Sequence, residues 1–337
     1  FPDQGNMPEE RTSRQAYDLL AEGFGPGFSG PLLVAVDTSN VSDQELRSLA
    51  VALQKDTGVA FVQPPERSPV GEAATILVFP TTAPQDPQTV DLLERIRGPI
   101  FSSVLADGSK AHVGGATASF ADVSDRVQSR LPIFITGVIA LSFILLMLVF
   151  RSILVPIKAA LLNLLSIGSA YGVLVMVFQW GWGQSLIGLE ETVPIVSFVP
   201  MFMFAVLFGL SMDYEVFLLS RVKEEYLVSG NNSQSVISGI SNTARVITSA
   251  ALIMISVFLG FVANPDPIMK MMGLGLATAI FVDATIVRVV LVPASMKLMG
   301  DANWWFPKRL AWLPRLDIEG EERLPAREFD SASQTAN

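Results

Sequence analysis

The chain has 337 residues, of which 50% are hydrophobic and 16% are charged, and its formal net charge is −9. This acidic balance, without a basic cluster before the apolar region, argues against a nucleic-acid partner. The chain has no cysteine and a single histidine, His112, which excludes disulfides and thiolate or multi-histidine metal sites. It has no phosphate-binding loop and no nucleophile–base pair, so we expect neither an enzyme nor a bound cofactor.

Residues 1–130 are mixed in composition and are predicted to form an α+β domain. Ser42 and Glu45 have the spacing of a helix capping box, and Pro87 stands where a first helical residue is expected. We predict helices at 8–23, after Ser42 and after Asp86, and strands at 31–36, 59–62, 74–79 and 110–113. This β-α-β-β-α-β order is that of the ferredoxin-like, split βαβ arrangement.

From residue 131 onward, apolar runs reach the length of about 20 residues that lets a helix cross a bilayer. A transmembrane domain is predicted at 131–300, with helices at 131–150, 153–180, 194–220, 243–263 and 269–299. A buried soluble core is the weaker reading, because so few polar residues could not cover five such helices. We expect a helix over 120–130 to run into the first span, and residues 301–337 to form a disordered tail.

Basic residues predict the orientation of the spans. They gather after the first, third and last spans, as Arg151, Lys158 and Arg221 illustrate, whereas the alternate turns carry almost none. By the positive-inside rule, the basic turns and the C-terminal tail are cytoplasmic and residues 1–130 lie outside the cell membrane. Because the chain begins at Phe1 without a leader, we expect an upstream membrane segment that places this external domain.

Three polar residues, Asp213, Tyr214 and Glu215, interrupt the apolar run of the third span. Ionisable groups in hydrocarbon are costly, so they indicate a functional site. Desolvation favours the neutral form of a carboxyl group, which allows Asp213 to hold and release a proton, and Tyr214 can donate a hydrogen bond to a neighbouring helix. As an alternative, Asp213 could have a purely structural role and hold neighbouring helices together, but we favour a role in proton transfer.

Two further charged residues, Asp283 and Arg288, lie in the middle of the last span. On an α-helix, residues five apart point roughly 140° away from each other, which is not an ideal geometry for a same-face pair. Each is therefore expected to meet partners on other helices, with Asp213 and Tyr214 as candidates. We predict that both belong to the same proton relay; a purely structural pairing is the alternative.

Other polar residues are predicted to be accessory. Glu215 falls on a different face from Asp213 and could line a cytoplasmic exit, and Arg245 is expected to anchor the start of the fourth span. The hydroxyls of Ser249 and Ser256 either hydrogen-bond to the relay or satisfy their own helix backbone. Close helix packing is predicted at two pairs of glycines, Gly168 with Gly172 and Gly273 with Gly275.

The polar motif identifies a family. Residues 208–221, FGLSMDYEVFLLSR, closely resemble the central helix of the mycobacterial membrane protein large (MmpL) family of the resistance-nodulation-division superfamily. Residues 283–294 and 303–305 resemble the family's final span, and residues 16–28 resemble the entrance to its second external porter domain. The likeness covers nearly the whole chain apart from the tail.

The resemblance implies a C-terminal half-transporter. Members of this family have two homologous halves, each with one span, an external porter domain and five further spans. An Asp–Tyr pair from each half forms the proton relay; Asp213 and Tyr214 match the C-terminal pair, and Asp283 and Arg288 match the charged residues of the last helix. The implied activity is proton-motive-force-driven export of lipids, glycolipids or other hydrophobic compounds. The implied partners are the N-terminal half, the membrane, protons and the cargo, with a homo-oligomer left open.

Two alternatives belong to other functional classes. The first is a non-transporting membrane scaffold that binds lipid or envelope-assembly partners, but a scaffold needs no such set of charged residues at mid-membrane. The second is a SecDF-like, proton-driven translocation aid. It would share the architecture but should lack the GLSMDYE motif at residues 209–215.

Overall fold

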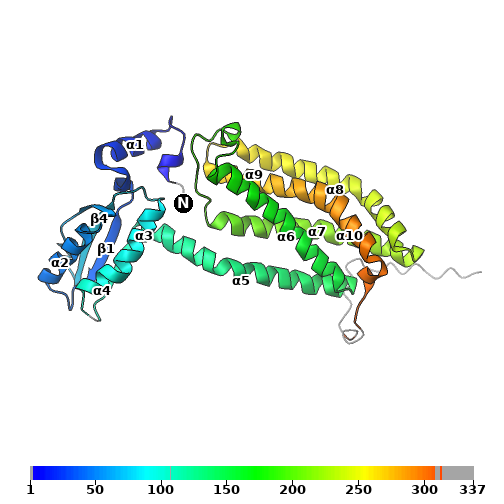
Figure 1. Cartoon of the computed structure of the whole chain (residues 1–337), viewed down its shortest axis with the longest axis horizontal. Coiled ribbons are helices and arrows are strands. Elements are labelled where there is room, and N and C mark those ends of the chain that lie inside the picture. Colours follow the sequence, from blue (N-terminus) through cyan, green and yellow to red (C-terminus); the bar gives the residue numbers. More distant parts are fainter. Residues whose placement is uncertain (1–2, 107, 308–311, 313–337) are drawn as a thin grey trace, which may run out of the picture.

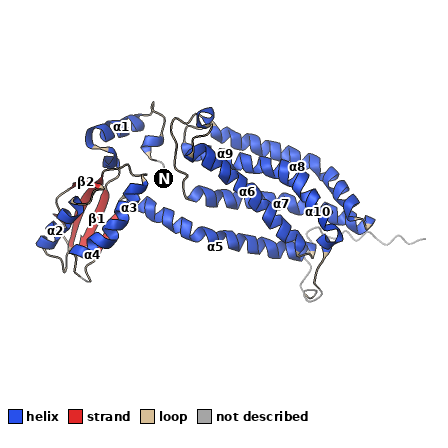
Figure 2. Ribbon diagram, in the orientation of Figure 1, coloured by secondary structure: helices blue, strands red, loops and turns tan. Residues whose placement is uncertain are grey.

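In the computed structural model, the N-terminal part of the chain forms an α+β domain, which lies at one end of a bundle of long helices (Figure 1). The structure describes residues 3–106, 108–307 and 312. Its sheet is confined to the N-terminal domain (Figure 2), and the rest of the described chain is helix and loop. The predicted fold class, an α+β domain followed by a five-helix membrane bundle, is confirmed.

The N-terminal sheet is antiparallel throughout, in the order β2-β4-β1-β5, with the short β3 also paired to β4. The strands are β1 (Leu32–Asp37), β2 (Val59–Val62), β3 (Glu66–Arg67), β4 (Ala73–Pro80) and β5 (Ala111–Gly114). Apart from the two-residue β3, this is the split βαβ connectivity that the sequence predicts. Leu32, Val34 and Val36 alternate along β1 and are buried, as a strand with one covered face requires.

Four helices complete this domain: α1 (Thr12–Phe24), α2 (Asp43–Gln54), α3 (Pro87–Arg95) and α4 (Phe101–Val104). The predicted capping box is present, because the Glu45 amide donates to Ser42 Oγ at 3.3 Å and the Ser42 amide donates to Glu45 Oε2 at 2.8 Å. Leucines of α2 and α3 pack with the strands into one core: Leu46, Leu49, Leu53, Leu92 and Leu93. The domain thus has a core of its own.

Five helical segments are long and apolar enough to cross a membrane. They are α5 (Ala116–Phe150), α6 (Leu154–Leu174, continued by a π-helical turn to Gln179), α7 (Phe198–Ser229), α8 (Asn232–Val262) and the run Pro267–Trp304. That last run comprises α9 (Pro267–Val282), a π-helical segment (Asp283–Leu291), α10 (Val292–Met299) and a 3-10 turn (Gly300–Trp304). The number of spans agrees with the prediction.

The ends of α7 and α8 differ from the predicted spans. Helix α7 continues beyond residue 220 to Ser229, and α8 begins at Asn232, well before the predicted start at 243. The polar residues in between show no apolar periodicity, which is why hydropathy misses them. Asn231 caps the start of α8, its side chain accepting from the Gln234 amide at 3.2 Å.

Helix α5 joins the two parts of the molecule and runs along the bundle to its far end (Figure 1). It starts sharply after Gly115, whose φ of 100° and closeness to the Pro31 carbonyl leave no room for a side chain. At its other end, Lys223 of α7 donates to the carbonyls of Val149 and Phe150, both at 3.2 Å. The predicted continuous helix from residue 120 through the first span is therefore confirmed.

The predicted disordered tail needs a correction at its start. Residues 301–304 form part of the 3-10 turn, and Asn303 is fully buried. Its side chain donates to the Met296 carbonyl at 2.7 Å, and Ser152 Oγ donates to its carbonyl at 2.5 Å. These hydrogen bonds hold the turn against the bundle. Residues 308–311 and 313–337 lie outside the described residues.

The predicted glycine contacts are only half right. A Cβ atom at Gly273 would lie 2.6 Å from the Phe258 carbonyl oxygen, and one at Gly275 would lie 2.3 Å from Met203 Cε, so both glycines permit close packing. A Cβ atom at Gly168 or Gly172 would meet nothing within 4 Å among the described residues, so the prediction is wrong for this pair within the described chain.

Gly239 is a close-packing site that the sequence does not reveal. A Cβ atom there would lie 2.5 Å from Val222 Cγ2 and 3.1 Å from the Val222 backbone. We expect Gly239→Leu to force α8 away from α7 and to destabilise the protein by about 1–3 kcal/mol. Thermal unfolding of the purified protein measures the effect. Gly260→Leu on the same helix is the matched control, because a Cβ atom there would meet no atom of the other described elements within 4 Å. Equal unfolding temperatures for the two variants would contradict the packing.

Candidate functional site

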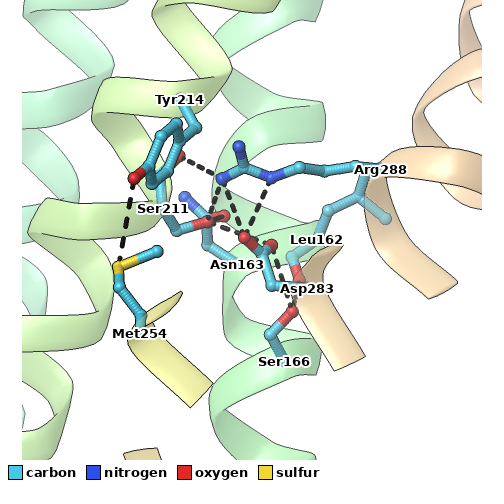
Figure 3. Close-up of polar contacts among 8 residues, drawn as sticks. All are labelled: Leu162, Asn163, Ser166, Ser211, Tyr214, Met254, Asp283 and Arg288. Atoms are coloured by element: carbon cyan, nitrogen blue, oxygen red, sulfur yellow. Dashed lines mark hydrogen bonds and ion pairs between the residues drawn. The ribbon is translucent and has the colours of Figure 1, made fainter. Parts of the chain in front are cut away.

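A buried ion pair joins Asp283 and Arg288 inside the helix bundle (Figure 3). Arg288 Nη2 lies 2.7 Å from Asp283 Oδ2, and Arg288 Nε donates to the same oxygen at 2.9 Å. The two residues are 9% and 6% exposed, respectively. At such depth each charge requires the other, because an isolated buried ion is strongly destabilised.

The direct pairing differs from the prediction, which placed these two residues on different faces of an α-helix. The backbone over Asp283–Leu291 is π-helical. In a π-helix, hydrogen bonds join residues five apart, so Asp283 and Arg288 lie roughly one turn above each other. Such segments are rare and occur frequently at functional sites.

Polar side chains from two other helices complete the cluster (Figure 3). From α7, the Ser211 carbonyl accepts from Arg288 Nη2 at 2.7 Å, and Ser211 Oγ lies 3.1 Å from Asp283 Oδ1. From α6, Asn163 Oδ1 accepts from Ser211 Oγ at 2.6 Å, and Ser166 Oγ lies 3.5 Å from Asp283 Oδ1. The ion pair therefore connects three helices.

Tyr214 packs against the ion pair. Arg288 Cζ lies 5.0 Å from the centre of the Tyr214 ring, and Figure 3 shows the ring beside the guanidinium group. A desolvated cation–π contact of this kind contributes about 2 kcal/mol. The Tyr214 hydroxyl donates a long contact of 3.9 Å to Met254 Sδ on α8. Three of the four predicted relay residues are thus brought together.

Asp213, the fourth predicted relay residue, does not join this cluster. Its side chain is exposed, on the side of α7 that the described chain leaves uncovered. The expectation that Asp283 and Arg288 meet Asp213 is therefore wrong within this chain, because Asp213 lies 100° around the helix from Tyr214. Exposed residues spaced three or four apart form an open stripe on α7: Phe202, Ala205, Gly209 and Asp213.

Glu215 is buried on the opposite side of α7 from Asp213, with 5% exposure. Among opposite charges, the Glu215 carboxyl group interacts most strongly with the ammonium group of Lys158 on α6, which is itself only 4% exposed. The predicted orientation uses Lys158 as a basic residue flanking the first cytoplasmic turn; in the structure it lies near the start of α6 and is buried inside the bundle.

The remaining accessory candidates lie away from the cluster. Arg245, Ser249 and Ser256 are all exposed on α8. Ser256 Oγ donates to the Leu252 carbonyl at 2.8 Å, so this hydroxyl satisfies its own helix. No hydrogen bond or ion pair links any of the three to the cluster within the described residues.

Sequence reasoning missed Asn163, Ser166 and Lys158. Their signal is present, since they are polar residues inside the apolar run of the second span, but they are not charged pairs at a recognisable spacing. A small cavity of about 20 Å³ adjoins the cluster between α6, α7, α8 and the last span. A volume of about 10–15 Å³ is enough for one water molecule, so this cavity has room for about one. No group of acidic or histidine side chains suited to a metal ion occurs in the described part of the chain.

Comparison with known proteins places the chain in a family. The model of the MMPL family matches residues 7–316. The membrane protein YdfJ of Bacillus subtilis is 39% identical over 96% of this chain and 44% of its own length. The mycolic acid-containing lipids exporter MmpL11 of Mycolicibacterium smegmatis is 36% identical over 93% of this chain and 33% of its own.

A third relative, the probable trehalose monomycolate exporter MmpL3 of Mycobacterium leprae, is 32% identical over 95% of this chain and 34% of its own length. The chain thus spans less than half the length of these curated relatives. The match covers both the N-terminal domain and the five apolar helices. This chain is a multi-pass membrane protein and belongs to the MMPL family.

Proposed function

We propose that this chain is the C-terminal half of a proton-driven exporter of lipids or other hydrophobic compounds, and that it is not an enzyme. The observation that carries the proposal is the buried Asp283–Arg288 ion pair, packed against Tyr214 within an apolar helix bundle. Charged groups are costly to keep inside a membrane, and those that persist mark ion and proton pathways. The names of the MmpL11 and MmpL3 relatives support lipid as the cargo.

In this proposal, Asp213 and Tyr214 carry the relay and the ion pair supports them. A proton from outside binds the Asp213 carboxylate and changes its pairing with the other half, and is then released inward. Arg288 contacts both the Ser211 backbone and the Tyr214 ring, so a shift of α7 is transmitted to the last span. Each proton that crosses the membrane supplies about 2.3 kcal/mol per 100 mV of potential.

The N-terminal half of the transporter is the proposed partner of the open stripe on α7, defined above by Phe202, Ala205, Gly209 and Asp213. A Cβ atom at Gly209 would meet nothing within 4 Å in the part of the chain that the structure describes. Small residues let the backbones of two membrane helices approach closely. A helix packed on this stripe would meet the Asp213 carboxyl group and could offer it a tyrosine partner.

The N-terminal domain is proposed to be the external porter domain, with the C-terminal tail in the cytoplasm. A cavity of about 730 Å³ lies between this domain and the bundle, within the roughly 300–1,000 Å³ typical of ligand cavities. Apolar and aromatic residues contribute to its lining, among them Tyr17, Val90, Phe120 and Ile195. Movement of the bundle would reach this cavity through α5, which contributes Phe120.

Dependence on the proton gradient tests the proposal. In cells that express the full-length protein, export of the lipid cargo should stop when a protonophore collapses the gradient. Depletion of ATP with the gradient maintained should leave initial export unchanged. Export that continues at its full rate without a proton gradient would exclude a proton-driven mechanism.

A further inference from the structure

A second pair of buried charged residues, Glu215 and Lys158, lies in the bundle apart from the Asp283–Arg288 ion pair. They come from α7 and α6 and are 5% and 4% exposed. Lys158 Nζ and Glu215 Oε1 are both buried and have no hydrogen-bond partner among the described residues. The two groups make no hydrogen bond with each other, yet they lie close enough to interact electrostatically.

This arrangement is poor as a structural ion pair. A buried pair stabilises a protein only when its geometry is good and its remaining polar atoms are satisfied; otherwise the desolvation penalty exceeds the attraction. The Asp283–Arg288 pair has direct contacts at 2.7 and 2.9 Å and further hydrogen bonds to Ser211, which leave only Arg288 Nη1 of this pair without a partner among the described residues. The Glu215–Lys158 pair has no such direct contact or supporting hydrogen bond among the described residues. Groups held in this way can change their protonation state without losing a network of hydrogen bonds.

The position of the pair relates it to the relay. Glu215 lies one helical turn beyond Ser211, in the direction of the far end of the bundle, and interacts electrostatically with Arg288 and Asp283. Lys158 lies about one turn from the first residue of α6, Leu154, at that same end. The pair therefore lies between the ion-pair cluster and the end of the bundle remote from the N-terminal domain (Figure 1).

We propose that Glu215 and Lys158 form a second proton-binding pair, which carries the proton from the relay to the far end of the bundle. The proposal rests on the proton-driven function above. The Glu215 carboxylate accepts the proton to become a neutral carboxylic acid, then releases it to water and becomes a carboxylate again. Lys158 remains an ammonium ion, and its positive charge favours the return of Glu215 to the ionised form.

Three variants of the full-length protein, reconstituted in vesicles with its lipid cargo, test this role. Glu215→Gln removes the proton acceptor, Lys158→Met removes its counter-charge, and the double variant removes both charges. We expect Glu215→Gln and the double variant to lower both proton movement and export at least tenfold. The double variant should unfold near the wild-type temperature, because it leaves no unpaired charge. Export at the wild-type rate by the double variant would overturn the proposal. The role of the two residues would then be structural only.

The Lys158→Met variant adds a second measurement, the pH dependence of export. A purely structural role of the pair would not change this dependence. Without the ammonium ion, Glu215 holds its proton more tightly, so release requires a higher pH on the receiving side. Export by this variant should therefore be slow at neutral pH and recover as that pH is raised, while wild-type export changes little. A pH profile parallel to the wild type would contradict the assignment. Glu224→Gln, at an exposed acid on the same helix, is the matched control and should keep wild-type export.

Asp213→Asn, measured alongside, separates this inference from the proposed function. If Asp213→Asn abolishes export while the double variant exports normally, the second pair is wrong and the relay stands. If Asp213→Asn exports normally, the proton-driven function itself is wrong.

Discussion

Asp213→Asn in the full-length protein is expected to abolish export while leaving folding and abundance unchanged. Asparagine has the size of aspartate but cannot take up or release a proton. Its stability cost should be small, because Asp213 is exposed within this chain and has no ion-pair partner among the described residues. Cargo export by cells that carry the variant, compared with the amount of protein in their membranes, measures the effect.

Asp213→Glu serves as the control for this prediction. It keeps a titratable carboxyl group on a longer side chain and should retain part of the export. Loss of export in both variants, together with loss of protein from the membrane, would show that the substitutions impair folding. Normal export by Asp213→Asn would rule out the relay.

Arg288→Met is expected to have the largest effect on stability. It leaves the Asp283 carboxylate buried without its partner, which typically costs about 3–5 kcal/mol. It also removes the donor to the Ser211 carbonyl and the cation that faces Tyr214. We expect a clearly lower unfolding temperature and no export, as measured by thermal unfolding in detergent and by cargo transport.

The double variant Asp283→Asn with Arg288→Met separates stability from function. Removing both charges should restore much of the unfolding temperature, because replacing a whole buried ion pair is often neutral. Export should stay absent. If the double variant exported cargo normally, the pair would be a structural link between helices and not a part of the relay.

The sequence predicts the architecture well because the signals are strong and local. Long apolar runs require a membrane, and alternating residues such as Leu32, Val34 and Val36 define a strand with one covered face. The Ser42–Glu45 capping box is likewise a local pattern that appears in the structure as expected. Helix ends in polar segments, such as the start of α8 at Asn232, carry no such signal and are missed.

The site is predicted only in part, because its geometry depends on tertiary contacts. The charged residues of the third and last spans stand out, and Tyr214, Asp283 and Arg288 do meet. Their direct ion pair requires a π-helical segment, whose position cannot be read from residue types. The joint burial of Lys158 and Glu215 depends on how α6 packs on α7, which residue types alone do not reveal.

Asp213 also shows how context decides the role of a motif residue. Neighbouring residues on α7 face different surroundings: Ser211 and Tyr214 contact the ion pair, Glu215 faces α6, and Asp213 points away from the described chain. One helix thus presents a carboxyl group on each of two sides. In the proposed full-length transporter, the outward-facing group is the one that the other half completes.

Proton movement by the purified full-length protein tests the central claim most directly. In vesicles that contain a pH-sensitive dye and an imposed proton gradient, cargo should accelerate proton entry through the wild-type protein. The same protein with Asp213→Asn should show only the leak of protein-free vesicles. Equal, cargo-dependent proton entry through both proteins would contradict the account.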